Sequence, residues 1–428
     1  MGDPETEDGA AFERRMQDPF SGLGRKPMGA MVTLRMRFNR IASRRSGSLF
    51  SAFMRRIDVY LGGLRTSSTG IIRERGEQVA MSQERPPLNL ADYEALAPGR
   101  MHPAVWDFIA AGADDGVTVA QNRRAFERIA LRPRVLVDVS RIDTGAVVLG
   151  SRIASPILIA PTGPHQALCQ DGEVATAQAA GRAGLALVVV GGSNRTIEDI
   201  AAAATGPLWL QLYLFAERER TLALVRRAEA AGCRALVLTA DSPRFGRKER
   251  SLRTEDEFDW PEAGNLEGLP PATTRPIRGA PATWEDLDWL RGVTRLPIVL
   301  KGVLTAQDAA LAVARGVEGI VISNHGGRQL DGSVASIEAL PEIVAEAGGS
   351  SEIYLDGGIR RGTDILKALA LGARAVMVGR PVLWGLAVAG AAGAQDVLEM
   401  LKRELELAMA IAGRPTLADI DASLILRR

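Results

Sequence analysis

The sequence predicts an α/β protein built on a TIM (β/α)8 barrel, with an N-terminal helical cap and a lid loop after strand 4. Three observations support this prediction. From about residue 155, eight short apolar runs alternate with amphipathic segments, which is the order of a parallel barrel. No GxGxxG motif opens the first helix, so an open dinucleotide-binding sheet is disfavoured. Polar side chains gather at the C-terminal ends of the runs, where barrel proteins carry their sites.

Composition narrows the class of protein. The chain has 428 residues and a formal net charge of +1, which gives no case for a nucleic-acid partner. Its two cysteines, Cys169 and Cys233, suggest neither a disulfide framework nor a catalytic thiol, and they fit a reducing, cytoplasmic location. No apolar run approaches the ~20 residues that span a bilayer. No metal site is expected.

Residues 1–85 differ in composition from the main domain, 86–428. They open with an acidic stretch and continue into an arginine- and serine-rich region between residues 35 and 75. Three interpretations stay open: a disordered tail, a basic amphipathic helix for a membrane surface or for targeting, and an artefact of a misplaced start codon. The tail or the artefact is favoured, because Met81 lies just before the main domain.

The main domain begins with the helical cap, over residues 88–150. Asn89 with acidic residues behind it is a helix-start signal, and a short helix is expected over 105–111. Barrel strands are then expected at 156–160, 186–190, 208–213, 235–239, 297–301, 319–322, 353–355 and 375–378. Helices are expected between them, for example at 173–183, 217–231, 306–315 and 362–371.

The longest interruption of this alternation is a Pro- and Gly-rich stretch from about 255 to 283, after the fourth strand. Its length and composition are typical of a mobile loop. Its position at the C-terminal end of a strand makes it a lid over the mouth of the barrel.

The most informative segment is SNHGGRQLD, residues 323–331, which follows the apolar run 319–322. Paired glycines let a ligand approach the backbone closely. His325 offers a proton acceptor near neutral pH, and Arg328 offers a fixed cation that can hold a carboxylate. A lone histidine is more often structural, but this strand-end context favours a functional role for His325.

The last two strand ends predict a phosphate site. The segment DGGIRRG, residues 356–362, joins a strand to a helix, and Gly379 and Arg380 end the next strand. Backbone N–H groups at a glycine-rich turn bind phosphate together with arginine, and the loops after strands seven and eight are the usual phosphate site of this fold. The pattern alone does not choose between FMN and a sugar phosphate.

The segment SNHGGRQLD resembles the signature of the FMN-dependent 2-hydroxy acid oxidising family, which includes glycolate oxidase, lactate oxidase and mandelate dehydrogenase. The resemblance extends from about Asn89 to the C-terminus. It implies FMN as the cofactor and oxidation of a small-molecule 2-hydroxy acid to a 2-oxo acid. It also implies oxygen or a redox partner as the electron acceptor, and a homotetramer.

The same resemblance implies roles for individual residues. Lys301 would lie at the N1/O2 edge of the flavin, and Gln211 and Thr239 would hydrogen-bond the ring. The N5 edge would face Pro161, Thr162 and Gly163. The ribityl chain and phosphate would be held by Ser323, Asp356, Gly357, Gly358, Arg360, Gly379 and Arg380.

For the substrate, the resemblance implies that His325 is the catalytic base and that Asp241 pairs with its imidazolium. Tyr213 would bind the substrate hydroxyl or carboxylate, and Arg328 the carboxylate. Asp241 also begins an Asp-Ser-Pro turn, so a helix cap is the competing interpretation of that residue.

Three features depart from the family pattern. Lys248 replaces a second carboxylate-binding arginine and lacks its bidentate fork. Phe108 replaces a substrate-binding tyrosine, and a flavin-contacting serine is replaced within residues 189–192. An ordinary 2-hydroxy acid and a bulkier or less polar substrate therefore both stay open. Gly163 slightly favours a dehydrogenase, because oxidases of the family often carry alanine there.

Three alternatives to an FMN-dependent 2-hydroxy acid oxidising enzyme are compatible with parts of the sequence. The same flavin chemistry could act on an amine or a biosynthetic intermediate. A non-catalytic flavoprotein is disfavoured because four expected catalytic and substrate-binding residues are all present: Tyr213, Asp241, His325 and Arg328. A flavin-free aldolase is disfavoured because Lys301 would need a depressed pKa beside two other cations.

Overall fold

The computed structural model describes residues 86–270 and 281–427. The expectations for residues 1–85, and for residues 271–280 of the predicted lid, fall outside the described residues. The boundary at residue 86 therefore stays a prediction.

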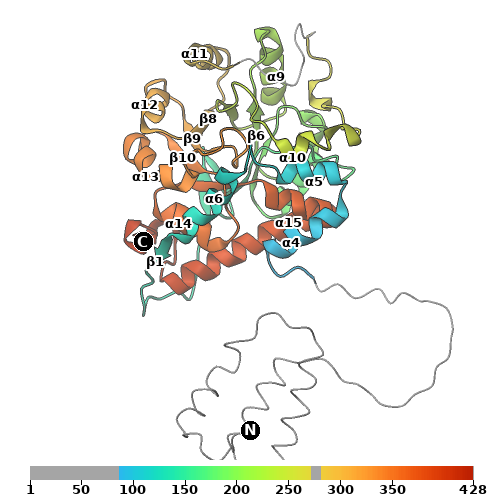
Figure 1. Cartoon of the computed structure of the whole chain (residues 1–428). Helices are drawn as coiled ribbons and strands as arrows, with labels where there is room; N and C mark the ends of the chain where they lie inside the picture. The colour runs from blue at the N-terminus through green and yellow to red at the C-terminus, as the bar shows by residue number, and fades with distance from the viewer. Residues whose placement is uncertain (1–85, 271–280, 428) are drawn as a thin grey trace, which may run out of the picture. The chain divides into compact units, whose positions relative to one another are not determined.

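The centre of the fold is a closed barrel of eight parallel strands, as predicted (Figure 1). Neighbouring strands pair in chain order, and the last strand closes onto the first. All four residues of the second, fourth, sixth and eighth strands are buried, because both faces of a barrel strand are covered. The strands are β4 (Ile157–Ile159), β5 (Ala186–Val189), β6 (Leu208–Leu212), β7 (Leu236–Thr239), β8 (Ile298–Val303), β9 (Gly319–Ile322), β10 (Glu352–Leu355) and β11 (Ala375–Val378).

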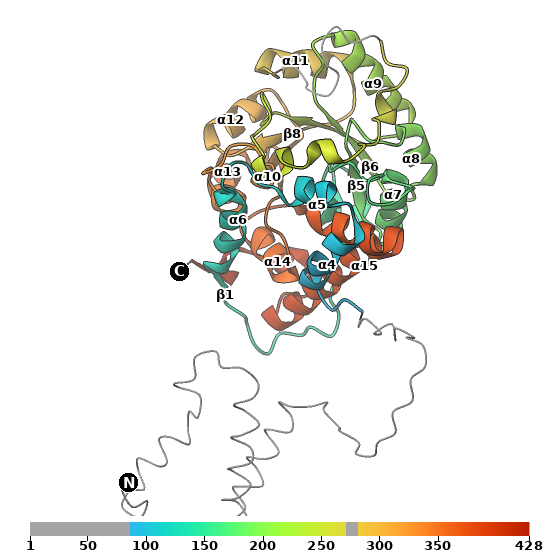
Figure 2. The same cartoon turned by 45° about the vertical axis from the view of Figure 1, so that its right-hand side comes forward.

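Helices surround the barrel (Figure 2). Several begin at the threonine that the sequence places before an apolar face: Thr196, Thr283 and Thr305 each accept a backbone N–H of the first turn through the side chain. The outer helices are α7 (Glu173–Arg182), α8 (Ile197–Ala203), α9 (Arg218–Ala230), α11 (Trp284–Val293), α12 (Ala306–Ala314), α13 (Ser336–Ala347), α14 (Gly362–Ala370) and α15 (Arg380–Ala412).

The N-terminal cap is helical, as expected. Asn89 caps its first helix by accepting the N–H groups of Ala91 and Asp92. The cap elements are α4 (Leu90–Leu96), η1 (Ala97–Arg100), α5 (Pro103–Ala110) and α6 (Val117–Glu127). After α6, β1 (Ile129–Leu131) pairs antiparallel with the C-terminal strand β12 (Ile425–Arg427), so the two ends of the domain are joined. A hairpin of β2 (Ala146–Val148) and β3 (Ser151–Ile153) precedes the barrel.

The described part of the predicted lid contains two short helices instead of an open loop, and a third short helix directly precedes it. The preceding helix is α10 (Glu249–Leu252), and the two within the lid are η2 (Glu255–Glu257) and η3 (Gly264–Leu266). Two asparagines link this segment to the barrel, one from each side. Asn194 donates its amide to the carbonyls of Pro261 and Glu262, and Asn265 donates to the carbonyl of Gly191. Its action as a lid stays a prediction.

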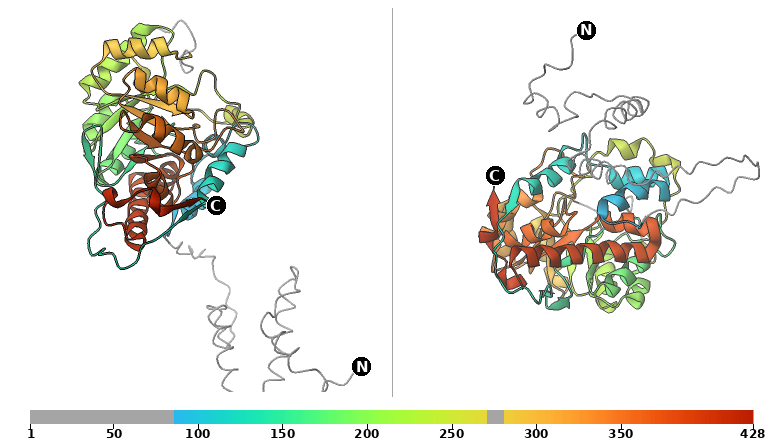
Figure 3. Two further views of the ribbon diagram at one scale, coloured as in Figure 1. Left: turned by 90° about the vertical axis from the view of Figure 1, so that its left-hand side faces the viewer. Right: turned by 90° about the horizontal axis from the view of Figure 1, so that it is seen from below.

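The longest helix, α15, packs beside α4, α7 and α14 (Figure 3). Its backbone departs from helical geometry at Ala389 and Gly390. Contrary to the expectation from sequence, α15 is long and apolar enough to cross a bilayer. Its most apolar window has a mean hydropathy of 1.2 and is 56% buried within the protein, as in a core helix. After α15, the short helices η4 (Leu417–Asp419) and η5 (Ala422–Leu424) lead to β12.

Candidate active site

A cavity of about 1310 Å³ lies at the C-terminal ends of the barrel strands. Most of the predicted site residues line this cavity: Phe108, Pro161, Thr162, Gly163, Tyr213, Lys248, Lys301, His325, Arg328, Asp356, Gly357, Gly358, Arg360, Gly379 and Arg380. The structure therefore brings these predicted residues together, because parallel strands deliver their C-terminal ends to one mouth of the barrel.

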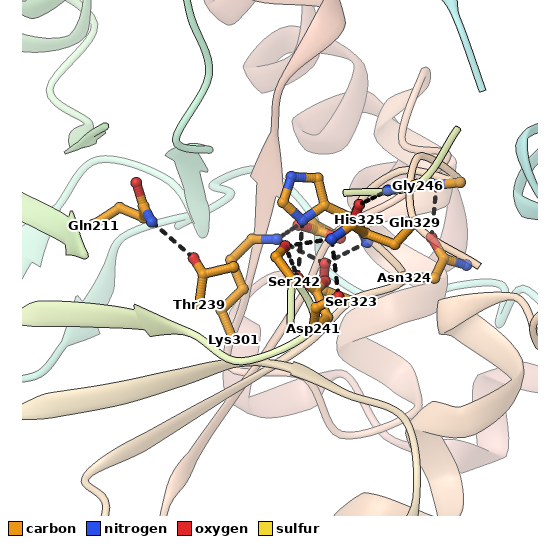
Figure 4. A network of polar contacts seen from close by, with 12 residues as sticks. Gln211, Thr239, Asp241, Ser242, Gly246, Lys301, Ser323, Asn324, His325 and Gln329 are labelled. Carbon is orange, nitrogen blue, oxygen red and sulfur yellow. Dashed lines mark hydrogen bonds and ion pairs between the residues drawn. The ribbon is translucent and has the colours of Figure 1, made fainter. Parts of the chain in front are cut away.

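Four predicted residues, Gln211, Thr239, Asp241 and Ser323, lie behind this lining and support it. Gln211 donates its amide to Thr239 Oγ1 at 3.0 Å and accepts the Gly191 N–H at 3.2 Å (Figure 4). Ser323 Oγ accepts from Lys301 Nζ at 2.7 Å and from the His325 N–H at 3.0 Å. The flavin contacts expected of these side chains stay predictions.

His325 and Asp241 form a pair. His325 Nδ1 lies 3.0 Å from Asp241 Oδ1, which also accepts the Ser242 hydroxyl at 2.9 Å. The second carboxylate oxygen of Asp241 is buried without a partner among the described residues. His325 has a φ of 58°, a strained value for a non-glycine residue that is typical of functional positions.

The surroundings of the pair set its protonation. Burial lowers the pKa of His325 below its usual 6.5, and Asp241 opposes that shift by stabilising the imidazolium. Burial opposes ionisation of Asp241, but His325 and Lys301 together hold the pKa of Asp241 below its usual value. The imidazole is therefore neutral near pH 7, and the carboxylate beside it stays charged. A neutral imidazole oriented by a carboxylate is the arrangement of a general base.

Lys301 is a buried cation on the floor of the cavity. Its Nζ lies 2.9 Å from Asp356 Oδ2, and both side chains are less than a tenth exposed. Burial disfavours the charged amine, yet Asp356 and Asp241 raise the pKa of Lys301 above its ordinary value. The other oxygen of Asp356 has no partner among the described residues. That oxygen is free to accept a ligand hydroxyl, as a ribityl chain would supply.

Two arginines create an excess of positive charge at the predicted phosphate site. Burial and then the neighbouring Arg380 lower the pKa of Arg360 to about 9. Burial and then Arg328 lower the pKa of Arg380 to about 10. Arg360 stacks over Trp384 at 4.7 Å and donates to the carbonyl of Ile359. Buried guanidinium groups that repel one another suit a phosphate dianion.

The backbone beside these arginines requires glycine. Gly357 and Gly358 have φ values of 91° and 87°, which side chains rarely adopt. A Cβ on Gly358 would come within 2.3 Å of the Asn122 carbonyl. The glycines, the two arginines and the unpartnered oxygen of Asp356 together fit FMN.

Arg328 holds the N-terminal cap in addition to its predicted role in binding a carboxylate. Its Nη1 donates to the carbonyls of Phe108, Ile109 and Ala111 at the end of α5. Arg380 donates to the last two of these carbonyls as well. Both arginines therefore fix the cap helix over the cavity. Among the described residues, all hydrogen bonds of Arg328 use Nη1, so Nε and Nη2 remain for a carboxylate.

The remaining predicted substrate residues lie on the cavity wall. Tyr213 packs edge-to-face against Phe245 at 6.0 Å, and burial followed by Asp241 raises the pKa of Tyr213, which keeps its hydroxyl a donor at neutral pH. Lys248 Nζ donates to the Gly246 carbonyl at 3.0 Å and lies 5.7 Å from the Phe245 ring. Phe108 lies between Arg328, at 4.9 Å, and Trp260, at 5.2 Å.

Two supporting features were missed at the sequence level. His165 is fully buried, with Nε2 3.0 Å from Thr162 Oγ1 and Nδ1 2.9 Å from Thr176 Oγ1. Asn324 and Asn122 exchange two amide hydrogen bonds of 2.8 Å, which tie the loop after β9 to the cap helix α6. His165 could have been noticed as one of three histidines, because it lies in the loop after the first barrel strand, just beyond Gly163.

Comparisons with known proteins point to one family. A family model described as FMN-dependent dehydrogenase matches residues 97–427. An L-lactate oxidase of Nostoc sp. is 47% identical over 359 residues, covering 79% of this chain and 98% of that protein. A peroxisomal (S)-2-hydroxyacid oxidase of Arabidopsis thaliana is 45% identical, covering 78% and 94%. A solved mandelate oxidase with (S)-2-phenylpropionate superposes with a TM-score of 0.74 at 42% identity, covering 80% and 99%.

Proposed function

The chain belongs to the FMN-dependent dehydrogenase family, and from that premise we propose how its residues carry out the reaction. It is an FMN-dependent enzyme that oxidises a 2-hydroxy acid to a 2-oxo acid. The alternative of an amine or a biosynthetic intermediate finds no support among the relatives named above, which are 2-hydroxy acid oxidases. One observation gives the main support for the proposed roles. His325 is paired with Asp241 and lines the same cavity as Lys301.

The cofactor is held by two groups of residues. Arg360, Arg380 and the glycines at 357, 358 and 379 bind the phosphate, and Asp356 and Ser323 bind the ribityl chain. Gln211, Thr239 and Lys301 would hydrogen-bond the ring, and Pro161, Thr162 and Gly163 would face its N5 edge. When bound, FMN takes up the two electrons that leave the substrate.

The substrate is held by its carboxylate and its hydroxyl. Arg328 pairs with the carboxylate, assisted by the charge of Lys248, and Phe108 covers the substrate on the cap side. Tyr213 donates its hydroxyl to the substrate. His325 accepts a proton from the substrate at Nε2, while Asp241 holds the resulting imidazolium at Nδ1.

The pH dependence of the reaction tests the role of the pair. The base must be neutral, and burial lowers the pKa of His325, so kcat/KM should rise with pH on an acid limb whose midpoint lies below 6.5 and then reach a plateau. The charge of Asp241 raises the pKa of His325, so Asp241→Asn should move that limb to still lower pH. The same variant should lower kcat by about 10–100-fold, because the imidazolium loses its partner.

Profiles of kcat/KM against pH for wild type and Asp241→Asn are the measurement. Asp138→Asn is the matched control, because Asp138 is exposed on a loop and should leave the profile in place. An acid limb that stays in place in Asp241→Asn would mean that another group titrates.

Oxygen is the proposed electron acceptor, supported by the oxidase names of the relatives. Gly163 favoured a dehydrogenase; a Cβ there would meet only Val190, at 3.5 Å, so packing does not require the glycine. With L-lactate in air we expect one hydrogen peroxide for each 2-oxo acid formed. Turnover with a dye acceptor but without oxygen consumption would identify a dehydrogenase.

A homotetramer and a cytoplasmic location complete the proposal. Val135 and Leu136 are 82% and 102% exposed on the loop after β1, and an apolar pair so exposed favours a subunit contact. Both cysteines are free thiols, which suits a reducing compartment.

A further inference from the structure

The cavity has an opening at Gly192 that the backbone does not require. Gly191 must be glycine, because a Cβ there would lie 2.6 Å from the Gln211 carbonyl. Gly192 is different: a Cβ there would meet nothing within 4 Å, and its φ lies outside the left-handed region. The backbone and its neighbours therefore do not exclude a Cβ at position 192. The missing side chain therefore leaves space in the cavity wall.

The same cavity is also lined by Gly192, Phe215, Arg220, Leu224 and Leu266, and we call the part of the cavity next to these residues the side lobe. These residues are neighbours. A Cβ on Gly191 would touch Leu224 at 3.7 Å, and Leu224 and Arg220 share one face of α9, four residues apart. Arg220 stacks over Phe215 at 4.8 Å. The walls of the side lobe are therefore apolar up to Arg220.

Arg220 is a buried cation in need of an anion. It is 5% exposed and donates through Nη1 to the Pro270 carbonyl. Its Nε has no hydrogen-bond partner, and no carboxylate forms an ion pair with it among the described residues. Three glutamates also line the cavity, but all of them are exposed: Glu255, Glu262 and Glu267. A buried guanidinium without a counter-charge is costly unless a ligand supplies one.

We propose that the side lobe is a specificity subsite, and that the preferred substrate is a 2-hydroxy acid with an apolar spacer and a second carboxylate at its far end. The proposal rests on the function proposed above, because the 2-hydroxy acid end is held at His325, Tyr213 and Arg328. The spacer passes Gly192 and packs against Leu224 and Phe215. The distal carboxylate then pairs with Arg220.

The test compares two series of 2-hydroxy acids by kcat/KM, from five to eight carbons. One series ends in a methyl group and the other in a carboxylate, from 2-hydroxyglutarate to 2-hydroxysuberate. At the best-fitting length, wild type should prefer the diacid over the monoacid by about tenfold or more, since the added contact is charge-assisted. In Arg220→Met the ratio of diacid to monoacid should fall to about one.

Two further variants complete the design. Arg226→Met removes an exposed cation from the same helix and should keep the wild-type ratio. Gly192→Trp fills the opening, so kcat/KM for the longest acids relative to L-lactate should fall by about tenfold or more. If Arg220→Met does not fold, the ratios of diacid to monoacid in Arg220→Gln and in wild type still show whether Arg220 binds the distal carboxylate.

Wild type that shows no diacid preference at any length, or a preference that survives loss of Arg220, would overturn the subsite. A wild-type enzyme that oxidises neither series nor L-lactate would instead contradict the proposed function itself. The two failures are thus distinguishable.

Discussion

Replacing His325 by glutamine should lower kcat by about 10²–10⁴-fold while FMN stays bound, because a positioned general base contributes rate enhancement of that size. Glutamine at this position would keep the backbone N–H that donates to Ser323 Oγ, because this hydrogen bond does not involve the side chain. It cannot accept a proton at neutral pH. The loss should therefore appear in kcat more than in KM.

Steady-state oxidation of L-lactate measures this loss, and the visible spectrum of the purified variant reports the bound flavin. His102→Gln is the matched control, because His102 is exposed, caps α5 through a long contact of 3.3 Å and otherwise packs on Phe258 with ring centroids 5.1 Å apart. A His325→Gln enzyme that keeps more than about a tenth of wild-type kcat would show that another group accepts the proton.

Replacing Lys301 by methionine should have the largest effect on stability. It would leave the carboxylate of Asp356 buried without its cation, and one oxygen of that carboxylate already lacks a partner. Removing one member of a buried pair costs about 3–5 kcal/mol of unfolding free energy. The variant should also purify with little FMN, because the floor of the cavity loses its positive charge.

Urea unfolding of the variant, with flavin content measured beside it, tests this prediction. Lys402→Met removes a partly exposed pair with Glu399 and should cost less than about 1 kcal/mol. The double variant Lys301→Met/Asp356→Asn should recover part of the lost stability, because no unpaired charge then stays buried. A cost for Lys301→Met as small as that for Lys402→Met would mean that the buried pair contributes little.

Much of the fold could be predicted from local sequence. All eight barrel strands were found because each is a short apolar run between helical segments. The pairing of β1 with β12 could not be found, since it joins residues such as Ile129 and Arg427 that have no local signal for each other. The hairpin of β2 and β3 was missed because its strands are only three residues long.

The candidate site was predictable to the same extent. Strand ends brought His325, Asp241 and Lys301 together as expected, because the barrel places those ends at one mouth. Contacts between the site and distant elements were not predictable. The hydrogen bonds from Arg328 to the carbonyls at the end of α5 depend on where the cap lies relative to the barrel. The opening at Gly192 depends on the lack of neighbouring atoms within 4 Å of a Cβ at that position.

The most direct test of the central claim is an anaerobic titration of the full-length protein with L-lactate, followed by its visible spectrum, in wild type and in His325→Gln. We expect a yellow wild-type protein whose flavin absorbance is bleached by the substrate, and a yellow variant that stays coloured. A variant bleached as fast as wild type would remove His325 from the mechanism. A colourless wild-type protein that takes up no added FMN would contradict the assignment of the cavity to FMN.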